Sequence, residues 1–105
     1  MQELQDPKAD AQLRGLILTM VYINHKRQRR RLTSTVIHGT IAREGYRFTK
    51  NDVLTAIQDL RDRDYLRYQQ VLDADQSVFI QAIELTAQGR DLVDRRFDDP
   101  AVMTQ

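Results

Sequence analysis

Apolar residues recur every three or four positions along two stretches of the first 45 residues, and this spacing is typical of amphipathic helices. The first stretch begins at Ala9 or Asp10 and extends to about residue 29. The second begins after Thr33 or Ser34, either of which can cap a helix, and ends at Gly45. The expected inward positions are Leu13, Leu16, Ile17, Met20 and Val21 in the first helix and Val36, Ile37 and Ile41 in the second.

A third helix has the best-marked start in the chain. Thr49 is a good N-cap, and Asp52, three residues later, can return its hydrogen bond as a short capping box. Phe48 and Val53 flank this start with the spacing of a hydrophobic staple. The apolar stripe comprises Val53, Ala56, Ile57 and Leu60, and the opposite polar face comprises Lys50, Asn51, Thr55, Gln58 and Asp59.

After Leu66 the hydrophobic period changes from that of a helix to that of a strand. Residues 67–72 and 77–85 are strand candidates, and the polar residues 73–76 between them have the composition of a turn. Thr86 then caps a last helix that continues to about Phe97. The sequence therefore predicts a hairpin followed by a helix.

The predicted elements follow the order helix, helix, short strand, helix, β-hairpin, helix, where the short strand is the extended piece between Gly45 and Thr49. This is the order of a winged helix-turn-helix, an α+β fold. We expect residues 1–8 to be a flexible leader, residues 9–97 to form the winged-helix domain, and residues 98–105 to be a C-terminal tail.

The composition narrows the class of protein. The chain has 105 residues, enough for one domain with its own core, and no cysteine, which excludes disulfides and thiolate metal sites. No apolar run approaches the ~20 residues that a membrane span needs, so we expect a cytoplasmic protein. His25 and His38 stand apart from any group of carboxylates, so neither a metal site nor a cofactor is expected.

Catalytic signatures are missing from the sequence. It has no glycine-rich phosphate loop, no spacing of Ser, His and Asp, and no paired carboxylates that suggest a pocket. We therefore do not expect an enzyme.

Positive charge is concentrated in one part of the chain. The formal net charge is only +1, yet seven of the 16 basic residues lie between residues 24 and 48, where Glu44 is the single acidic residue. Five of them fall in the six positions 26–31. This block is larger than a helix C-terminus needs for its dipole, and it favours a phosphate-binding patch.

The chain resembles the winged-helix DNA-binding superfamily over about residues 12–97. The resemblance is carried by the segment from Phe48 to Leu60, by Asp64–Leu66 before the hairpin, and by Leu85–Leu92. The last of these is similar to the leucine-threonine-x-x-glycine entry to the final helix of bacterial winged-helix regulators. Ile83–Val93 with Pro100–Val102 is also similar to the ending of small winged-helix proteins of Mu-like prophages, which have no settled role.

This resemblance implies a protein that binds double-stranded DNA, and it suggests a transcriptional regulator. The third helix of such proteins enters the major groove, and the helix before it lies against the phosphates. Carried over to this chain, base edges or phosphates would be contacted by Lys50, Asn51, Thr55 and Gln58. Phosphates would be held by Thr33, Ser34 and Thr35, with added positive charge from Arg29, Arg30 and Arg31.

Acidic residues leave a second interpretation open. Asp59 is expected to face outward on the third helix, and Asp73 and Asp75 lie at the tip of the hairpin, where DNA-binding wings usually carry Arg or Lys. Phosphate would repel these carboxylates. The alternative is a winged helix that binds a protein partner through its acidic wing and does not bind DNA.

The resemblance also suggests a homodimer formed through the first and last helices. The first helix is expected to expose Leu18, Tyr22 or Ile23 opposite its core stripe, and these side chains would suit a partner helix.

Overall fold

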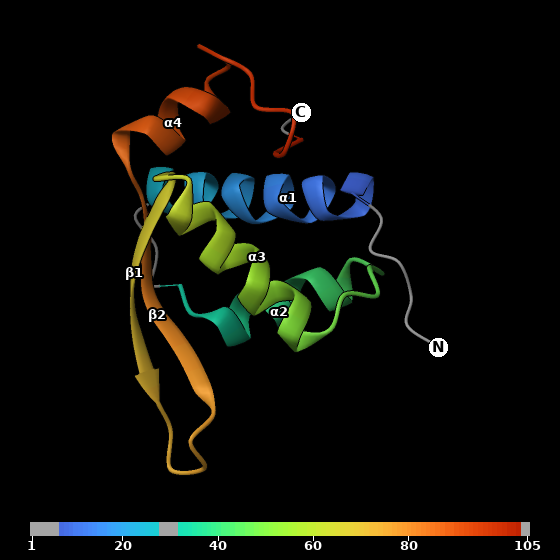
Figure 1. Cartoon of the computed structure of the whole chain (residues 1–105), viewed down its shortest axis with the longest axis vertical. Coiled ribbons are helices and arrows are strands. Elements are labelled where there is room, and N and C mark those ends of the chain that lie inside the picture. The colour runs from blue at the N-terminus through green and yellow to red at the C-terminus, as the bar shows by residue number, and fades with distance from the viewer. Residues whose placement is uncertain (1–6, 28–31, 104–105) are drawn as a thin grey trace.

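The computed structural model describes residues 7–27 and 32–103. It is an α+β structure in which three helices precede an antiparallel hairpin and a final helix (Figure 1). The elements are α1 (Pro7–Lys26), α2 (Ser34–Arg43), α3 (Lys50–Asp62), β1 (Leu66–Leu72), β2 (Val78–Leu85) and α4 (Ala87–Val93).

The predicted starts of the second, third and last helices are confirmed, whereas α1 begins at Pro7, before the predicted start at Ala9 or Asp10. The hydroxyl oxygens of Thr33, Thr49 and Thr86 each accept a hydrogen bond from the backbone N–H three residues later, at the starts of α2, α3 and α4. At α3 the capping box is complete, because the Asp52 carboxylate accepts a hydrogen bond from the Thr49 N–H at 2.9 Å. After α2, Gly45 adopts a φ of +92°, a conformation that strains most other residues. Local capping therefore fixes where these helices begin.

Two helix ends differ from the expectation. α1 ends at Lys26, three residues before the predicted end, and residues 28–31 lie outside the described part of the chain. α4 ends at Val93 instead of near Phe97, because Arg95 adopts a φ of +61° and turns the chain away from the helix axis. Helical periodicity in the sequence continues past Val93, and it does not indicate the change of backbone direction at Arg95.

The short strand predicted before α3 is wrong, since the described residues between α2 and α3 form no strand. The backbone of Phe48 is held instead by a side chain, because its carbonyl oxygen lies 3.2 Å from His38 Nε2 on α2. A residue that precedes α2, rather than one before α3, pairs with the hairpin. Leu32 forms an isolated antiparallel bridge with Ile83, whose N–H donates to the Leu32 carbonyl at 3.3 Å.

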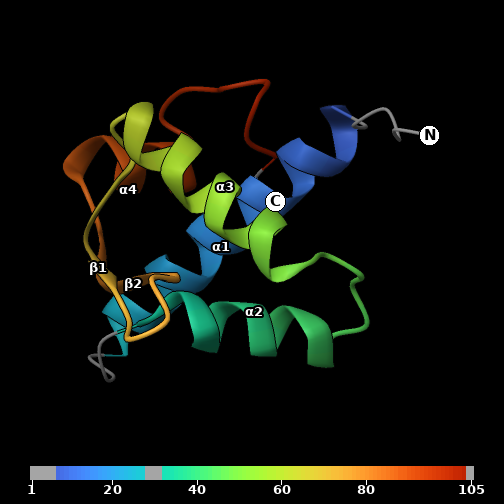
Figure 2. The same ribbon diagram turned by 60° about the horizontal axis from the view of Figure 1, so that its bottom comes forward.

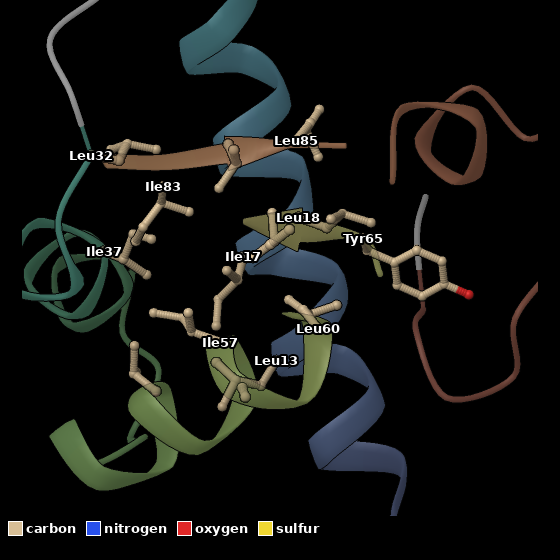
Figure 3. Close-up of a cluster of buried hydrophobic side chains, with 14 of the residues drawn as sticks. Leu13, Ile17, Leu18, Leu32, Ile37, Ile57, Leu60, Tyr65, Ile83 and Leu85 are labelled. Carbon is tan, nitrogen blue, oxygen red and sulfur yellow. The ribbon is translucent and has the colours of Figure 1, made fainter. Parts of the chain in front are cut away.

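Buried side chains from α1, α2, α3 and the hairpin meet in one core (Figure 3). The predicted stripe of α3 is confirmed, since Val53, Ile57 and Leu60 have no exposed surface. Leu18 is also fully buried, which corrects its expected place on the outside of α1. The reason is that α1 packs against α3, β2 and α4 together, so its apolar face is wider than a single stripe.

The hairpin packs against the helices mainly through β2, while β1 contacts α3 and contributes Leu66 to the core. β2 contacts α1 and α2, and the views in Figures 1 and 2 show the two strands extending past the helical layer. Ser34 joins α2 to this strand, because its buried hydroxyl oxygen accepts the Ile80 N–H at 3.2 Å. The strand register shifts between Arg67 and Gln69, where β2 has one extra residue, and Ala82 there adopts a φ of +54°. This is a β-bulge.

The segment expected to be a tail packs onto α1 as far as the structure describes it. Val102 is buried, and the Met103 N–H donates to the Ala11 carbonyl at 3.0 Å. A Cβ added to Gly15 would overlap the Met103 carbonyl group. A glycine at this position therefore lets the backbones of α1 and the C-terminal segment approach closely.

Two helical glycines give a matched test of this kind of packing. A Cβ at Gly89 would overlap the Tyr65 carbonyl oxygen, whereas a Cβ at Gly39 would meet nothing within 4 Å. We expect Gly89→Ala to lower the free energy of unfolding by about 2 kcal/mol or more, because backbone must move. Gly39→Ala should raise it by about 0.5–1 kcal/mol through helix propensity. Urea denaturation measures both, and equal effects would contradict the packing.

Candidate nucleic-acid interface

The outward face of α3 is polar and accessible. Lys50, Asn51 and Thr55 are exposed and Gln58 is half-buried, so the four residues that the sequence assigned to this face do share one side of the helix. Asn51, Thr55 and Gln58 follow one another at steps of four and three residues and form a single row. Their amide and hydroxyl groups are of the kind that hydrogen-bond to base edges or phosphates.

The hydroxyl residues at the start of α2 divide into two groups. Thr35 is exposed, and Thr33 caps the helix, its Oγ accepting the Val36 N–H at 3.2 Å. Ser34, in contrast, is buried and bound to the backbone of β2, so it is not accessible to a phosphate and leaves the candidate interface.

Arg29, Arg30 and Arg31 lie outside the described residues, so their place relative to α3 stays a prediction. The described residues just before them are basic and exposed. Lys26 Nζ lies 5.3 Å from the centre of the Tyr22 ring. Arg90 of α4 approaches the same helix end, with its Nη2 at 3.2 Å from His25 Nε2. Positive charge therefore gathers where the C-terminal end of α1 meets α4.

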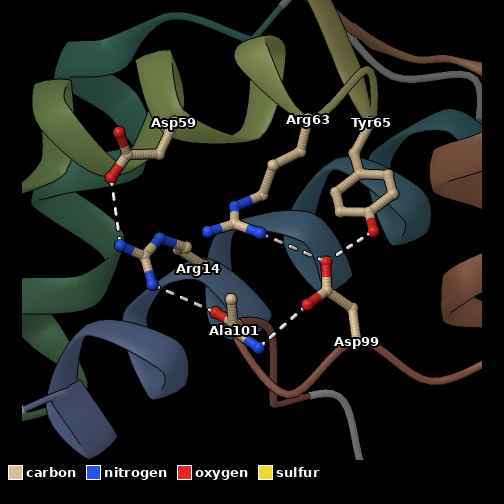
Figure 4. A network of polar contacts seen from close by, with 6 residues as sticks. All are labelled: Arg14, Asp59, Arg63, Tyr65, Asp99 and Ala101. Atoms are coloured by element: carbon tan, nitrogen blue, oxygen red, sulfur yellow. Dashed lines mark hydrogen bonds and ion pairs between the residues drawn. The ribbon is translucent and has the colours of Figure 1, made fainter.

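The Asp59 carboxylate does not face outward as the sequence suggested. It turns toward α1, where its Oδ2 lies 3.1 Å from Arg14 Nη2 (Figure 4). The second terminal nitrogen of Arg14 donates to the Ala101 carbonyl at 3.1 Å. One guanidinium therefore joins α1, α3 and the C-terminal segment, and it neutralises the carboxylate that appeared least compatible with DNA.

Asp99 is the centre of a second set of polar contacts in the same region (Figure 4). Its Oδ2 accepts the Tyr65 hydroxyl at 2.5 Å and lies 3.6 Å from Arg63 Nη1, while its Oδ1 accepts the Ala101 N–H at 2.9 Å. Burial raises the pKa of Tyr65 to about 12, with the Asp99 hydrogen bond acting in the same direction. Burial alone would raise the pKa of Asp99, but these hydrogen bonds and the charges of Arg63 and Arg14 hold it below its usual value.

The wing differs from a basic DNA-binding hairpin. Asp73 has a structural role, because its Oδ1 accepts the N–H groups of Asp75 and Ser77 and closes the turn. The strand before it exposes apolar side chains, with 39% of the surface of Val71 and 58% of that of Leu72 accessible. The wing is therefore acidic at its tip and apolar along β1.

Sequence reasoning missed three residues that hold the interface in place. Arg14, His38 and Asp99 act on residues 45, 10 and 34 positions away, respectively. No short-range spacing reports such contacts. For Arg14 the sequence offered one signal. It is a charged residue beside the apolar stripe of a helix, and a residue in that position often takes part in a buried ion pair.

No protein-family model matches this sequence, and neither a curated protein nor a solved structure matches it significantly. The order of elements is compatible with a winged helix, and the resemblance rests on that order and on the segments 48–60, 64–66 and 85–92. Within the described ranges, no helix is long and apolar enough to cross a bilayer. No group of three or more metal-binding side chains occurs in the same ranges.

Two neighbouring hydroxyl residues at the start of α2 have different expected roles, structural for Ser34 and binding for Thr35. Ser34→Ala should lower the free energy of unfolding by about 1–3 kcal/mol, because it leaves the Ile80 N–H buried without an acceptor. Thr35→Ala should change it by less than about 0.5 kcal/mol, because Thr35 is exposed. Urea denaturation of both variants checks this difference, and a stable Ser34→Ala variant would contradict the assigned contact.

The Tyr65–Asp99 contact predicts the stability of the protein at both extremes of pH. Neutral Tyr65 is favoured in the folded state, so the contribution of Tyr65 to stability should be constant below pH about 10 and be lost as the pH rises toward about 12. Ionised Asp99 is favoured in the folded state, so its contribution should be present above pH about 4 and be lost as the pH falls through its lowered pKa.

Urea midpoints measured across this pH range test both statements. Tyr65→Phe should reduce the alkaline dependence and leave the part due to Tyr68, whose pKa is also raised by burial, whereas Tyr46→Phe, at a half-buried site away from Asp99, should retain all of it. An unchanged alkaline limb in Tyr65→Phe would show that another group is responsible.

Proposed function

We propose that this protein is a winged-helix protein that binds double-stranded DNA, with α3 in the major groove. The order of three helices, hairpin and final helix supports this architecture. In this arrangement α3 is the recognition helix, and the start of α2 lies against the phosphate backbone. A role as a transcriptional regulator is the natural extension of such binding.

The observation that carries the proposal is the orientation of two of the three acidic residues of α3. The third, Asp62, is exposed at the end of the helix and lies 3.7 Å from Arg61. Asp59 is paired with Arg14, and Asp52 is engaged in the capping box at Thr49. The row that faces solvent therefore presents Asn51, Thr55 and Gln58 without either carboxylate. A polar surface of this kind is compatible with a DNA groove, whereas two free aspartates would oppose binding.

Each group on this surface has a distinct expected role. Asn51 and Gln58 can form paired hydrogen bonds with adenine, and each such pair contributes about 1–3 kcal/mol of base discrimination. Lys50 and Thr35 would contact phosphates, which contribute affinity without sequence information. Arg29, Arg30 and Arg31 would add further phosphate contacts and make binding sensitive to salt.

Fluorescence anisotropy with labelled random duplex DNA at several salt concentrations tests this proposal. Wild-type binding should weaken steeply with salt. Replacing Arg29, Arg30 and Arg31 with Ala should reduce the slope of log affinity against log salt by up to ~0.9 for each phosphate that the variant no longer neutralises. Asn51→Ala should lower the preference among selected sites while leaving the slope nearly unchanged.

Arg96→Ala serves as the charge control for Lys50→Ala, because each variant loses one positive charge and Arg96 lies beyond α4. Lys50→Ala should weaken binding more than Arg96→Ala does. The proposal fails if no duplex binds at low salt, or if the two variants are equally affected.

A second candidate function is a protein-interaction module that does not bind DNA. It is favoured by the exposed Val71 and Leu72 on β1, together with the acidic tip formed by Asp73 and Asp75. These features would suit a partner with apolar and basic side chains. Absence of DNA binding in the anisotropy experiment would leave this candidate in place.

A further inference from the structure

β1 has an unpaired edge whose hydrogen-bonding groups can be assigned residue by residue. Asp73 donates its N–H to the Ser77 carbonyl at 3.0 Å, so its backbone points toward β2. In an antiparallel ladder this direction alternates along the strand. The backbone N–H and C=O groups of Val71 and Gln69 therefore also point toward β2, where these two residues pair with Phe79 and Gln81. The backbone groups of Gln70, Leu72 and Tyr68 point away from β2.

The outer edge lacks two of the features that usually prevent strand pairing, proline and lysine. Figure 1 shows β1 on the side of the hairpin that faces away from α2. Of residues 66–72 only Arg67 is charged, and Val71 and Leu72 have 39% and 58% of their surface exposed. Natural edge strands are usually shortened, charged or covered, so an edge of this length with one charged side chain indicates an interaction site.

We propose that β1 pairs with β1 of a second copy of this chain, antiparallel and centred on Gln70. In this register Gln70 lies opposite the partner's Gln70, and Leu72 lies opposite the partner's Tyr68. All the outward-pointing backbone groups then find hydrogen-bonding partners, and the two hairpins form one four-stranded sheet. The register also places Arg67 opposite the partner's Asp73, on both sides of the two-fold axis.

Charge complementarity is the reason for choosing a second copy as the occupant. The strand is bounded by one basic and one acidic residue, Arg67 and Asp73, and antiparallel self-pairing brings unlike charges together at both ends. Arg67 also lies 3.8 Å from Glu84 across the hairpin. In the dimer it would therefore lie between two carboxylates, whereas a parallel pairing would place like charges side by side.

α1, the other surface expected to form a dimer, is less suitable. Leu18 is buried, and the Tyr22 hydroxyl donates to Asp94 at 2.9 Å, within the same chain. Ile23, at 44% exposure, is the one of the three expected side chains that is exposed. The pairing along β1 has both apolar contacts and backbone hydrogen bonds, which a single isoleucine does not provide.

Sedimentation equilibrium from micromolar to hundreds of micromolar protein tests this proposal. The wild-type chain should reach the mass of two chains. Leu72→Lys should weaken the dimer by at least about tenfold, because it places a charge on the paired edge. Ile23→Lys is the matched control, since it makes the same change at an exposed apolar residue of α1, and it should leave the dimer intact. Circular dichroism verifies that both variants are folded.

Single cysteines test the register, because the natural chain has none. Gln70→Cys should form an intermolecular disulfide under mild oxidation, since opposite residues at the two-fold axis have Cα atoms about 5.5 Å apart. Val71→Cys should cross-link much less, since it lies opposite the partner's Gln69. A monomer at every concentration, a dimer insensitive to Leu72→Lys, or a dimer lost in Ile23→Lys would overturn the proposal. Preferential cross-linking of Val71→Cys would do so as well.

Discussion

The guanidinium of Arg14 is the interaction on which the arrangement of the candidate interface depends. It binds the Asp59 carboxylate on α3 and the Ala101 carbonyl in the C-terminal segment, so three parts of the chain meet at one side chain. Asp99 adds a second junction a short distance away through Tyr65 and Arg63. Apolar packing brings α3 against α1 and fixes which side of α3 faces solvent, and the ion pair then turns the Asp59 carboxylate at the edge of that side toward α1.

This junction also explains why a nearly neutral chain can present a surface compatible with DNA. A carboxylate that is paired with a cation contributes less to the field outside the protein than a free one, so the balance of charges in the sequence is a poor guide to the charge at the surface. The outward row of α3 presents amide and hydroxyl groups, while exposed carboxylates remain at Asp62 near the end of α3 and at the tip of the wing. The two ends of the molecule are therefore suited to different contacts.

Local signals in the sequence were sufficient for much of the fold. Threonine caps located the starts of α2, α3 and α4, and the change of hydrophobic period located the hairpin, because these signals act within a few residues. The predictions that were wrong depended on distant partners. Leu32 reaches the hairpin only because Ile83 lies beside it in space, and Leu18 is buried because α1 is covered on several sides.

The candidate site, like the fold, was predictable where local spacing determines it and not where distant partners do. Lys50, Asn51, Thr55 and Gln58 share the face that helical spacing assigned to them. The roles of Ser34 and Asp59 could not be read from spacing. A residue at the boundary of a buried face turns inward or outward according to whether a neighbouring element offers it a partner, here the Ile80 N–H and Arg14 respectively.

The bulge at Ala82 has a consequence for how this protein can change over evolution. It interrupts the ladder between the part of the hairpin that contributes Leu66 and Leu85 to the core and the part that carries the tip. Ile80, on the tip side of the bulge, is still buried in the core, so it is variation nearer the tip, within residues 72–77, that leaves the register of the core strands unchanged. The outer wing can diversify to suit new partners while the helical core retains its packing, so it behaves as an exchangeable module on an unchanged scaffold.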